Sequence, residues 1–153
     1  MDFALIQDQS LYLLTGILVF VLLILLALRI GRRFGRSHAI NEIDEMDGIE
    51  FESFCAGLLK KRGFSEVQVT RSSGDFGIDI LAQKEGVTYA IQCKRYHEAV
   101  GVKAVQEACA GREYYDRMVG VVMTNQYFTE PAVKAAKKLK ILLWDREYLD
   151  EIL

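Results

Sequence analysis

The sequence contains few of the residues that break or cross-link a chain. One proline is present, and the three cysteines, Cys55, Cys93 and Cys109, include no CxxC pair. An odd number of cysteines within apolar patterns argues against a disulfide framework and fits a reducing compartment. The single proline and the short loop-forming stretches favour one compact domain without internal repeats.

An excess of positive charge is also absent. The chain carries 19 lysines and arginines against 21 aspartates and glutamates, which gives a formal net charge of −2. This balance excludes a polycation that binds nucleic acid through its overall charge. Any contact with nucleic acid therefore requires a local basic surface.

What the sequence does contain is one long apolar run. Residues 11–28 include no charged side chain, and a helix of this length rises roughly 27 Å, close to the ~30 Å hydrocarbon core of a bilayer. A buried core helix would show a polar face, and a cleaved signal peptide would begin with basic residues; the run has neither feature. The sequence therefore predicts a transmembrane helix over residues 11–30.

Basic residues follow the apolar run: Arg29, Arg32, Arg33 and Arg36. The positive-inside rule then predicts a single-pass protein of the inner or plasma membrane. Residues 1–10 are expected outside, and everything after the span is expected in the cytoplasm. Residues 31–47 are expected to form a basic juxtamembrane segment and linker, and residues 48–153 the folded domain.

Periodicity in the second part of the chain predicts alternating helices and strands. Asp47 and Glu50 have the spacing of a capping pair at the start of the first helix, and Gly63 is expected to end that helix. The order of elements predicts an α/β fold, a mixed sheet flanked by helices with an α-β-β-β-α-β core. The expected strands are 66–70, 78–83, 87–95, 118–124 and 141–144, and the expected later helices are 102–115, 130–140 and 146–153.

Two of these strands form a predicted hairpin. A two-residue turn at Glu85 and Gly86 sets a register in which Asp79 faces Gln92. Lys94 lies on the same face as Gln92, because side chains two residues apart on a strand point the same way. The opposite face is expected to be core: Ile78, Ile80, Ala82, Val87, Tyr89, Ile91 and Cys93.

The face with Asp79, Gln92 and Lys94 carries the parts of a metal-assisted hydrolytic site. A carboxylate and an amide carbonyl are hard oxygen ligands that suit Mg²⁺. A lysine beside them can orient a water or stabilise the charge of a phosphorane-like transition state. An ordinary solvated strand face shows the same alternation, so spacing alone leaves both interpretations open.

Two motifs resemble the catalytic motif of the Mrr-type restriction endonuclease domain: GDFGIDI at residues 74–80 and QCK at residues 92–94. That family belongs to the PD-(D/E)xK nuclease superfamily, in the variant with glutamine at the middle position. The similarity extends over residues 48–149 and begins with FE in the first helix. It implies the same α-β-β-β-α-β core.

The resemblance also implies roles for single residues. Asp79, Gln92 and the backbone carbonyl of Cys93 correspond to metal ligands, and Lys94 to the catalytic lysine. Glu52 corresponds to the glutamate of the first helix. Glutamine removes one negative charge, so Mg²⁺ is expected to bind more weakly than at a site with two carboxylates, unless Glu52 or a DNA phosphate supplies charge.

The loop before the hairpin supplies further candidates. Asp75 matches an acidic residue of the family, and its role is left open. Arginine and hydroxyl side chains suit contacts with phosphate, although a plain surface loop has the same composition. The candidate DNA contacts are Arg71, Ser72, Ser73 and Arg95.

Together these features predict a membrane-anchored DNA endonuclease that uses Mg²⁺ or another divalent cation to hydrolyse phosphodiester bonds. DNA and the membrane are the expected partners, and a homodimer is left open. The first rival is a catalytically silent module of the same fold that tethers DNA to the membrane. The second is a membrane interaction protein in which the fold is only a scaffold.

Overall fold

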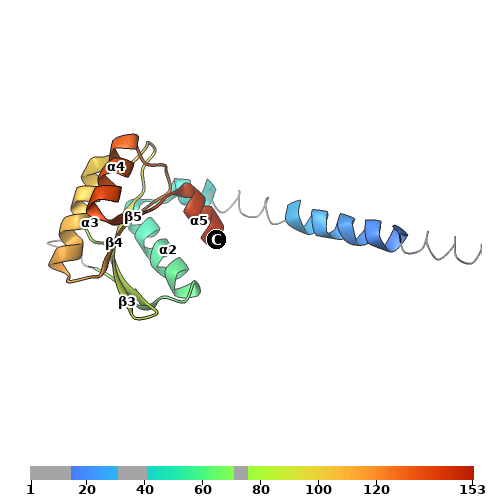
Figure 1. Cartoon of the computed structure of the whole chain (residues 1–153), viewed down its shortest axis with the longest axis horizontal. Coiled ribbons are helices and arrows are strands. Elements are labelled where there is room, and N and C mark those ends of the chain that lie inside the picture. The colour runs from blue at the N-terminus through green and yellow to red at the C-terminus, as the bar shows by residue number, and fades with distance from the viewer. Residues whose placement is uncertain (1–14, 31–40, 71–75) are drawn as a thin grey trace, which may run out of the picture. The chain divides into compact units, whose positions relative to one another are not determined.

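The structure is a computed structural model, and it describes residues 15–30, 41–70 and 76–153. The chain divides into two compact units, Met1–His38 and Ala39–Leu153. The second unit contains all the labelled helices and strands of Figure 1.

The first unit contains a helix over residues 15–30. Residues 11–14 of the predicted span lie outside the described residues. Of the helices in the described ranges, none is both long enough and apolar enough to cross a membrane. The predictions of a transmembrane helix in the fold and of a single-pass membrane location, with residues 1–10 outside, are therefore wrong.

The second unit is built on one mixed sheet. Its strands are β1 (Ser65–Val69), β2 (Ile80–Lys84), β3 (Val87–Lys94), β4 (Val119–Thr124) and β5 (Ile141–Trp144), and they lie in this order across the sheet. The pairs β1–β2 and β2–β3 are antiparallel, and the pairs β3–β4 and β4–β5 are parallel. The predicted mixed sheet and order of elements are confirmed.

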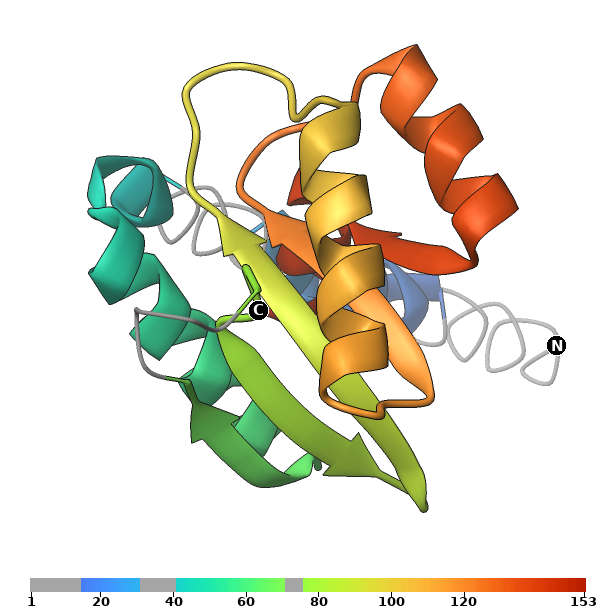
Figure 2. The same cartoon turned by 90° about the vertical axis from the view of Figure 1, so that its left-hand side faces the viewer.

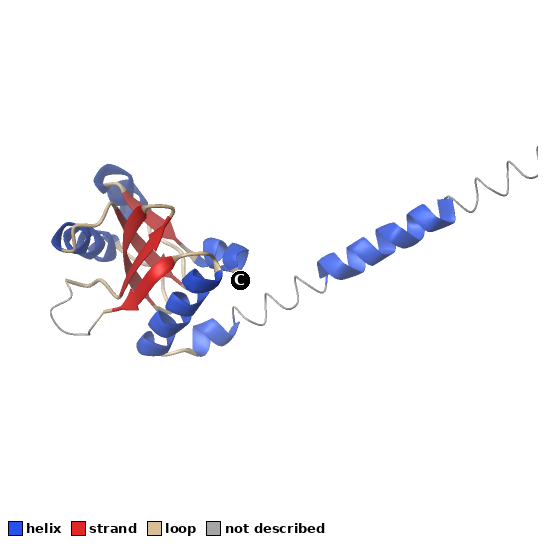
Figure 3. Cartoon of the chain, turned by 90° about the horizontal axis from the view of Figure 1, so that it is seen from below, coloured by secondary structure: helices blue, strands red, loops and turns tan. Residues whose placement is uncertain are grey.

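Helices cover both faces of this sheet (Figure 3). The first face packs against α2 (Gly48–Lys61) and α5 (Arg146–Ile152), and the second against α3 (Val102–Tyr114) and α4 (Glu130–Leu139). Strands buried on both faces are apolar along their whole length, which explains the continuous apolar run of β4. The first core includes Phe51, Leu59, Ile80, Ile91, Met123 and Leu149, and the second includes Val105, Ala108, Val122 and Ala132.

Helix α2 begins with the predicted capping pair. The Asp47 carboxylate accepts a hydrogen bond from the N–H of Glu50 at 2.8 Å, and the Glu50 carboxylate accepts one from the N–H of Asp47 at 2.9 Å. These reciprocal bonds satisfy two backbone donors that a helix start leaves unpaired. The helix ends at Lys61, and Gly63 follows with a φ of 83°, where the chain turns away.

The hairpin of β2 and β3 has the predicted turn and register. Ile80 pairs with Ile91, and the turn residues Glu85 and Gly86 have φ values of 52° and 80°. Two successive positive φ values are typical of a type I′ turn, whose twist matches that of the strands. Burial of Ile91 and Cys93 under α2 makes a one-residue slip costly, because the slip would turn both side chains to the other face.

The regular pairing begins at Ile80, and the chain before it departs from the predicted alternation. Ile78 is fully buried, but it packs beneath α3, where a Cβ added to Gly111 would overlap its side chain. Ile80 instead belongs to the core beneath α2. The prediction that Ile78 and Ile80 share one face is wrong, because the ladder is not regular before β2.

Candidate functional site

Asp79 lies directly before β2 and is held by backbone bonds on both sides. Its N–H donates to the carbonyl of Ile91, and its own carbonyl accepts from the N–H of Thr70, both at 2.9 Å. Its carboxylate Oδ2 accepts from the N–H of Cys93 at 2.6 Å. The regular ladder therefore stops short of an Asp79–Gln92 pair, and the carboxylate is bound to the backbone of β3 instead.

Gln92 and Lys94 meet a residue that the sequence analysis did not select, Glu107 of α3. The Nε2 of Gln92 donates to Oε2 of Glu107 at 2.7 Å, and the Nζ of Lys94 lies 3.1 Å from the same oxygen. Lys103, one turn earlier on α3, lies 3.7 Å from Oε1. Figure 2 shows α3 in front of the sheet beside β3. Gln92 is fully buried, which excludes an ordinary solvated strand face.

The surroundings of Glu107 favour the ionised form of its carboxyl group. Burial alone would raise the pKa of its carboxyl group, but hydrogen bonds from Gln92 and Lys94 and the charges of Lys94 and Lys103 outweigh burial and lower that pKa. A carboxylate can only accept hydrogen bonds. The amide of Gln92 must therefore turn its nitrogen toward Glu107 and its oxygen away.

That oxygen is unusual. Gln92 Oε1 is buried and has no hydrogen-bond partner among the residues that the structure describes. A buried polar atom left unpaired costs about 1–3 kcal/mol, a cost that a cation ligand would remove. The amide oxygen of Gln92 and the carboxylate of Asp79 are hard donors that fit Mg²⁺, which accepts few protein ligands and keeps several waters. No group of three His, Cys, Asp or Glu side chains gathers into a metal site within the described ranges.

Gly77 makes room for the contact between Gln92 and Glu107. Its φ is 77°, and an added Cβ would lie 2.8 Å from Nε2 of Gln92 and 3.3 Å from Cβ of Glu107. Glycine adopts this conformation without steric cost and presents no side chain to the amide. The second glycine of the GDFG motif therefore has a structural reason at this position.

Glu52 approaches β3 from α2. Contact with the Cys55 thiol and burial raise the pKa of the Cys93 thiol well above its usual range, and the charges of Asp79 and Glu52 add to this effect. Both carboxylates therefore lie near Cys93. Glu52 is placed on the α2 side of the sheet, whereas Gln92 contacts α3 on the other side. All three cysteines of the chain are free thiols, as the sequence predicted.

The remaining predicted residues contribute less to this geometry. Arg95 donates through Nε to the carbonyl of Met46, and its Nη1 lies 2.7 Å from Nε2 of His97. Its guanidinium is therefore partly engaged within the fold. The other candidates lie outside the described residues: Arg71, Ser72, Ser73 and Asp75.

A small pocket opens where β3 ends and α3 begins. Its volume is about 100 Å³, and Lys94, Tyr96, Lys103 and Glu107 are among the residues that line it. Pockets for drug-sized ligands are several times larger, at about 300–1,000 Å³. The surroundings of Lys94 therefore suit a charged group on an extended substrate better than a whole small molecule enclosed in the protein.

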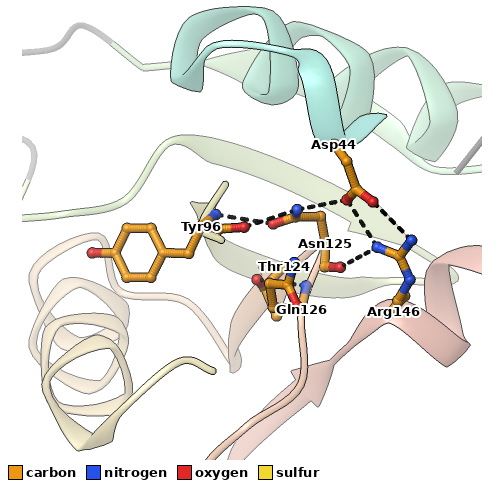
Figure 4. Close-up of polar contacts among 6 residues, drawn as sticks. All are labelled: Asp44, Tyr96, Thr124, Asn125, Gln126 and Arg146. Carbon is orange, nitrogen blue, oxygen red and sulfur yellow. Dashed lines mark hydrogen bonds and ion pairs between the residues drawn. The ribbon is translucent and has the colours of Figure 1, made fainter. Parts of the chain in front are cut away.

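A polar network ties the segment before α2 to the ends of the strands (Figure 4). Asp44 accepts from Nη1 and Nη2 of Arg146 and from Nδ2 of Asn125, each at 2.8 Å. Asn125 also bonds the N–H and the carbonyl of Tyr96, at 2.9 and 3.0 Å. The network thus links residues 41–45, the chain just after β3 and β4, and the first turn of α5.

Asp44→Asn is expected to lower the free energy of unfolding by about 1–2 kcal/mol, because the bidentate ion pair with Arg146 is lost. Glu130→Gln, which breaks an exposed pair with Lys134, is the control and should cost under about 0.5 kcal/mol. Urea unfolding of both variants measures the difference.

The Asp44 effect is also expected to depend on pH. Hydrogen bonding to Arg146 lowers the pKa of Asp44 below its ordinary value. The unfolded state therefore binds the proton first, so the stabilisation is complete above about pH 4 and is lost as the pH falls through the lower folded pKa. A difference between wild type and Asp44→Asn that stays constant down to strongly acidic pH would contradict this assignment.

Three features together define a restriction-endonuclease-like domain. They are the mixed sheet, the Asp79 carboxylate at the open end of the hairpin and the strand that carries QCK. The family model of Mrr_cat, described as a restriction endonuclease, matches residues 43–153, and the chain belongs to this family. The match begins at Ile43, which is 1% exposed, next to Asp44 of the polar network. The family that the motifs resembled is confirmed.

Three solved structures are similar to this chain. The first is a protein of unknown function, AF1548, with 26% identity over 63% of this chain and 57% of that chain and a TM-score of 0.55. The second is the DNA modification-dependent restriction endonuclease AspBHI, with 19% identity over 78% of this chain and 35% of that chain and a TM-score of 0.57. The third is the MspJI restriction endonuclease in complex with a 27-mer oligonucleotide, with 17% identity over 79% and 30% and a TM-score of 0.54.

The last two similarities establish the fold alone. The chain spans 57% of the length of the first structure and about a third of the other two. No curated protein sequence matches the chain.

Proposed function

We propose that this chain is a divalent-metal-dependent nuclease domain that hydrolyses phosphodiester bonds in DNA. The observation that carries the proposal is the buried, unpaired Oε1 of Gln92, two residues before Lys94 on a strand whose backbone binds the Asp79 carboxylate. Membership of a restriction endonuclease family supports the reaction class. The oligonucleotide bound by the similar MspJI supports DNA as the substrate.

Each side chain has a separate proposed role. Asp79, Gln92 and the backbone carbonyl of Cys93 would hold the cation, which when bound lowers the pKa of a water and offsets charge on the phosphate. Lys94 carries an ammonium group that is restrained by Glu107 and still partly exposed, with 22% of its side chain accessible. It can therefore donate to a phosphate oxygen and stabilise the charge that develops there.

The support for Glu52 as a residue of the proposed site is weaker than that for Asp79, Gln92 and Lys94. It is half-buried and near Cys93, so its carboxylate can add negative charge on the α2 side of β3. Glu50 is a poor competitor, because its carboxylate is already used to cap α2. Glu52 is therefore the proposed source of the charge that glutamine at position 92 does not supply.

The test is cleavage of supercoiled DNA by the full chain with Mg²⁺, with Mn²⁺ and with a chelator, at one stated salt concentration. Nicking or linearisation that requires the cation supports the proposal. DNA binding without cleavage at any cation concentration favours the silent binding module instead. One observation makes that rival concrete: Gln92 is neutral, and the charge of Glu107 is already offset by Lys94 and Lys103.

A further inference from the structure

Glu107 occupies a position that a carboxylate rarely takes. The buried side of α3 is otherwise formed by small and apolar residues: Ala104, Val105, Ala108 and Gly111. Glu107 lies three residues after the first of these and four before the last, so it shares their side of the helix. Burial of a charge is costly unless it is paired and hydrogen-bonded, and Gln92 and Lys94 provide both here.

Two side chains that Glu107 contacts, Gln92 and Lys94, are the QCK residues proposed to act in hydrolysis. One oxygen, Oε2, binds both Gln92 at 2.7 Å and Lys94 at 3.1 Å. Because a carboxylate paired with the Lys94 ammonium group accepts hydrogen bonds and never donates them, it holds Nε2 of Gln92 and leaves the buried Oε1 as the amide atom that can bind a cation. A neutral partner could hold the amide in either orientation, since an amide both donates and accepts.

We propose that Glu107 is a positioning residue: it fixes the orientation of the Gln92 amide, so that the oxygen and not the nitrogen is presented as a ligand, and it restrains Lys94 beside it. This inference rests on the proposed metal-dependent function. It assigns the helix α3 a role in a site that the motifs place on the first helix, the loop and the hairpin. Partners of this kind, which orient a ligand without touching the metal, commonly change metal affinity or activity 10- to 100-fold when removed.

Gly77 supports this assignment from the other side of the amide. Its backbone allows Nε2 of Gln92 to lie where a Cβ would be only 2.8 Å away. The amide nitrogen is therefore enclosed between a residue without a side chain and a carboxylate. A packing role alone would not need a charged group, because an apolar residue of similar volume fills such a site at no electrostatic cost.

The experiment compares Glu107→Gln with the wild type in the full chain. Glutamine has nearly the same shape, but it allows both orientations of the Gln92 amide and removes the charge beside Lys94. Glu113→Gln is the matched control, because Glu113 lies on the same helix and pairs with Arg112, away from Gln92. The readouts are Mn²⁺ affinity by titration, DNA cleavage at saturating Mn²⁺, and the free energy of unfolding in urea.

We expect Glu107→Gln to weaken Mn²⁺ binding by about 10- to 100-fold and to slow cleavage at saturating Mn²⁺, while Glu113→Gln changes neither. Unchanged Mn²⁺ affinity together with a loss of stability would reduce Glu107 to a structural residue and overturn the inference. If Glu107→Gln does not fold, hydrogen exchange in the metal-free wild type tests the inference instead. Slow solvent exchange of the Gln92 side-chain amide protons supports their contact with Glu107, and fast exchange overturns the inference.

The same data separate this inference from the proposed function. If Glu107→Gln cleaves DNA as well as the wild type does, the nuclease proposal stands and the inference fails. If the wild type binds Mn²⁺ in a Glu107-dependent way but does not cleave DNA, the inference stands and the nuclease proposal fails. If the wild type binds no Mn²⁺ at millimolar concentration, the inference and the nuclease proposal both fail.

Discussion

Lys94→Ala is expected to lower the rate of DNA cleavage at saturating Mg²⁺ by about 100- to 1,000-fold, the usual effect of removing one donor that stabilises transition-state charge. The ammonium group is held 3.1 Å from Glu107 at the end of β3, outside both apolar cores, so the fold should remain intact. Initial rates on supercoiled DNA measure the effect. Lys134→Ala is the control, because Lys134 is exposed on α4 and pairs with Glu130 in a helical i,i+4 contact.

A second variant distinguishes the roles within the site. Asp79→Asn removes the negative charge of a proposed metal ligand and so weakens Mg²⁺ binding; its loss of cleavage should therefore be partly recovered by raising the Mg²⁺ concentration, whereas that of Lys94→Ala should not. Full activity of Lys94→Ala, with circular dichroism unchanged, would remove lysine from the mechanism. Equal recovery of both variants by Mg²⁺ would show that the two roles have been assigned wrongly.

Gly77→Ala is expected to damage both stability and the site, and Gly86→Ala provides a control with almost the same backbone angle. The φ values are 77° and 80°, so both substitutions pay a similar conformational cost. Only at Gly77 would the new Cβ meet another side chain, Nε2 of Gln92 at 2.8 Å; at Gly86 nothing lies within 4 Å.

The overlap at Gly77 is expected to add about 1–3 kcal/mol of destabilisation beyond that of Gly86→Ala, the usual cost of an extra methyl group in a filled space. It should also displace the Gln92 amide and reduce cleavage about 10- to 100-fold, while Gly86→Ala remains active. Urea unfolding and cleavage rates measure the two effects. Equal stability and activity in the two variants would mean that the Gln92 amide is not held against Gly77.

Local signals predicted most of the secondary structure. The capping pair of Asp47 and Glu50 is formed by residues three apart, and the turn at Glu85 and Gly86 sets the hairpin register through adjacent residues. Such contacts need no knowledge of the rest of the fold. The motifs GDFGIDI and QCK also indicated the family, which the match over residues 43–153 confirms.

The apolar run predicted a membrane span that the described part of the chain does not contain. The prediction rested on composition and length over residues 11–30, and no helix in the described ranges is both long and apolar enough to cross a bilayer. A run of apolar residues indicates a preference to avoid water, but it does not by itself specify a helix that crosses a bilayer. The predicted span and the membrane location both rested on that run.

The sequence by itself determined the order of the elements, the hairpin register and the alternation that puts Gln92 and Lys94 on one side of β3. Only the tertiary structure decided what meets them there: Glu107 is 15 residues from Gln92 in the chain, and Asp44 is 102 residues from Arg146. A carboxylate on the small-residue side of α3 was the one local signal for Glu107. Contacts of this kind depend on how a helix packs on a sheet, and a periodic pattern specifies which face is buried but not which polar group it touches.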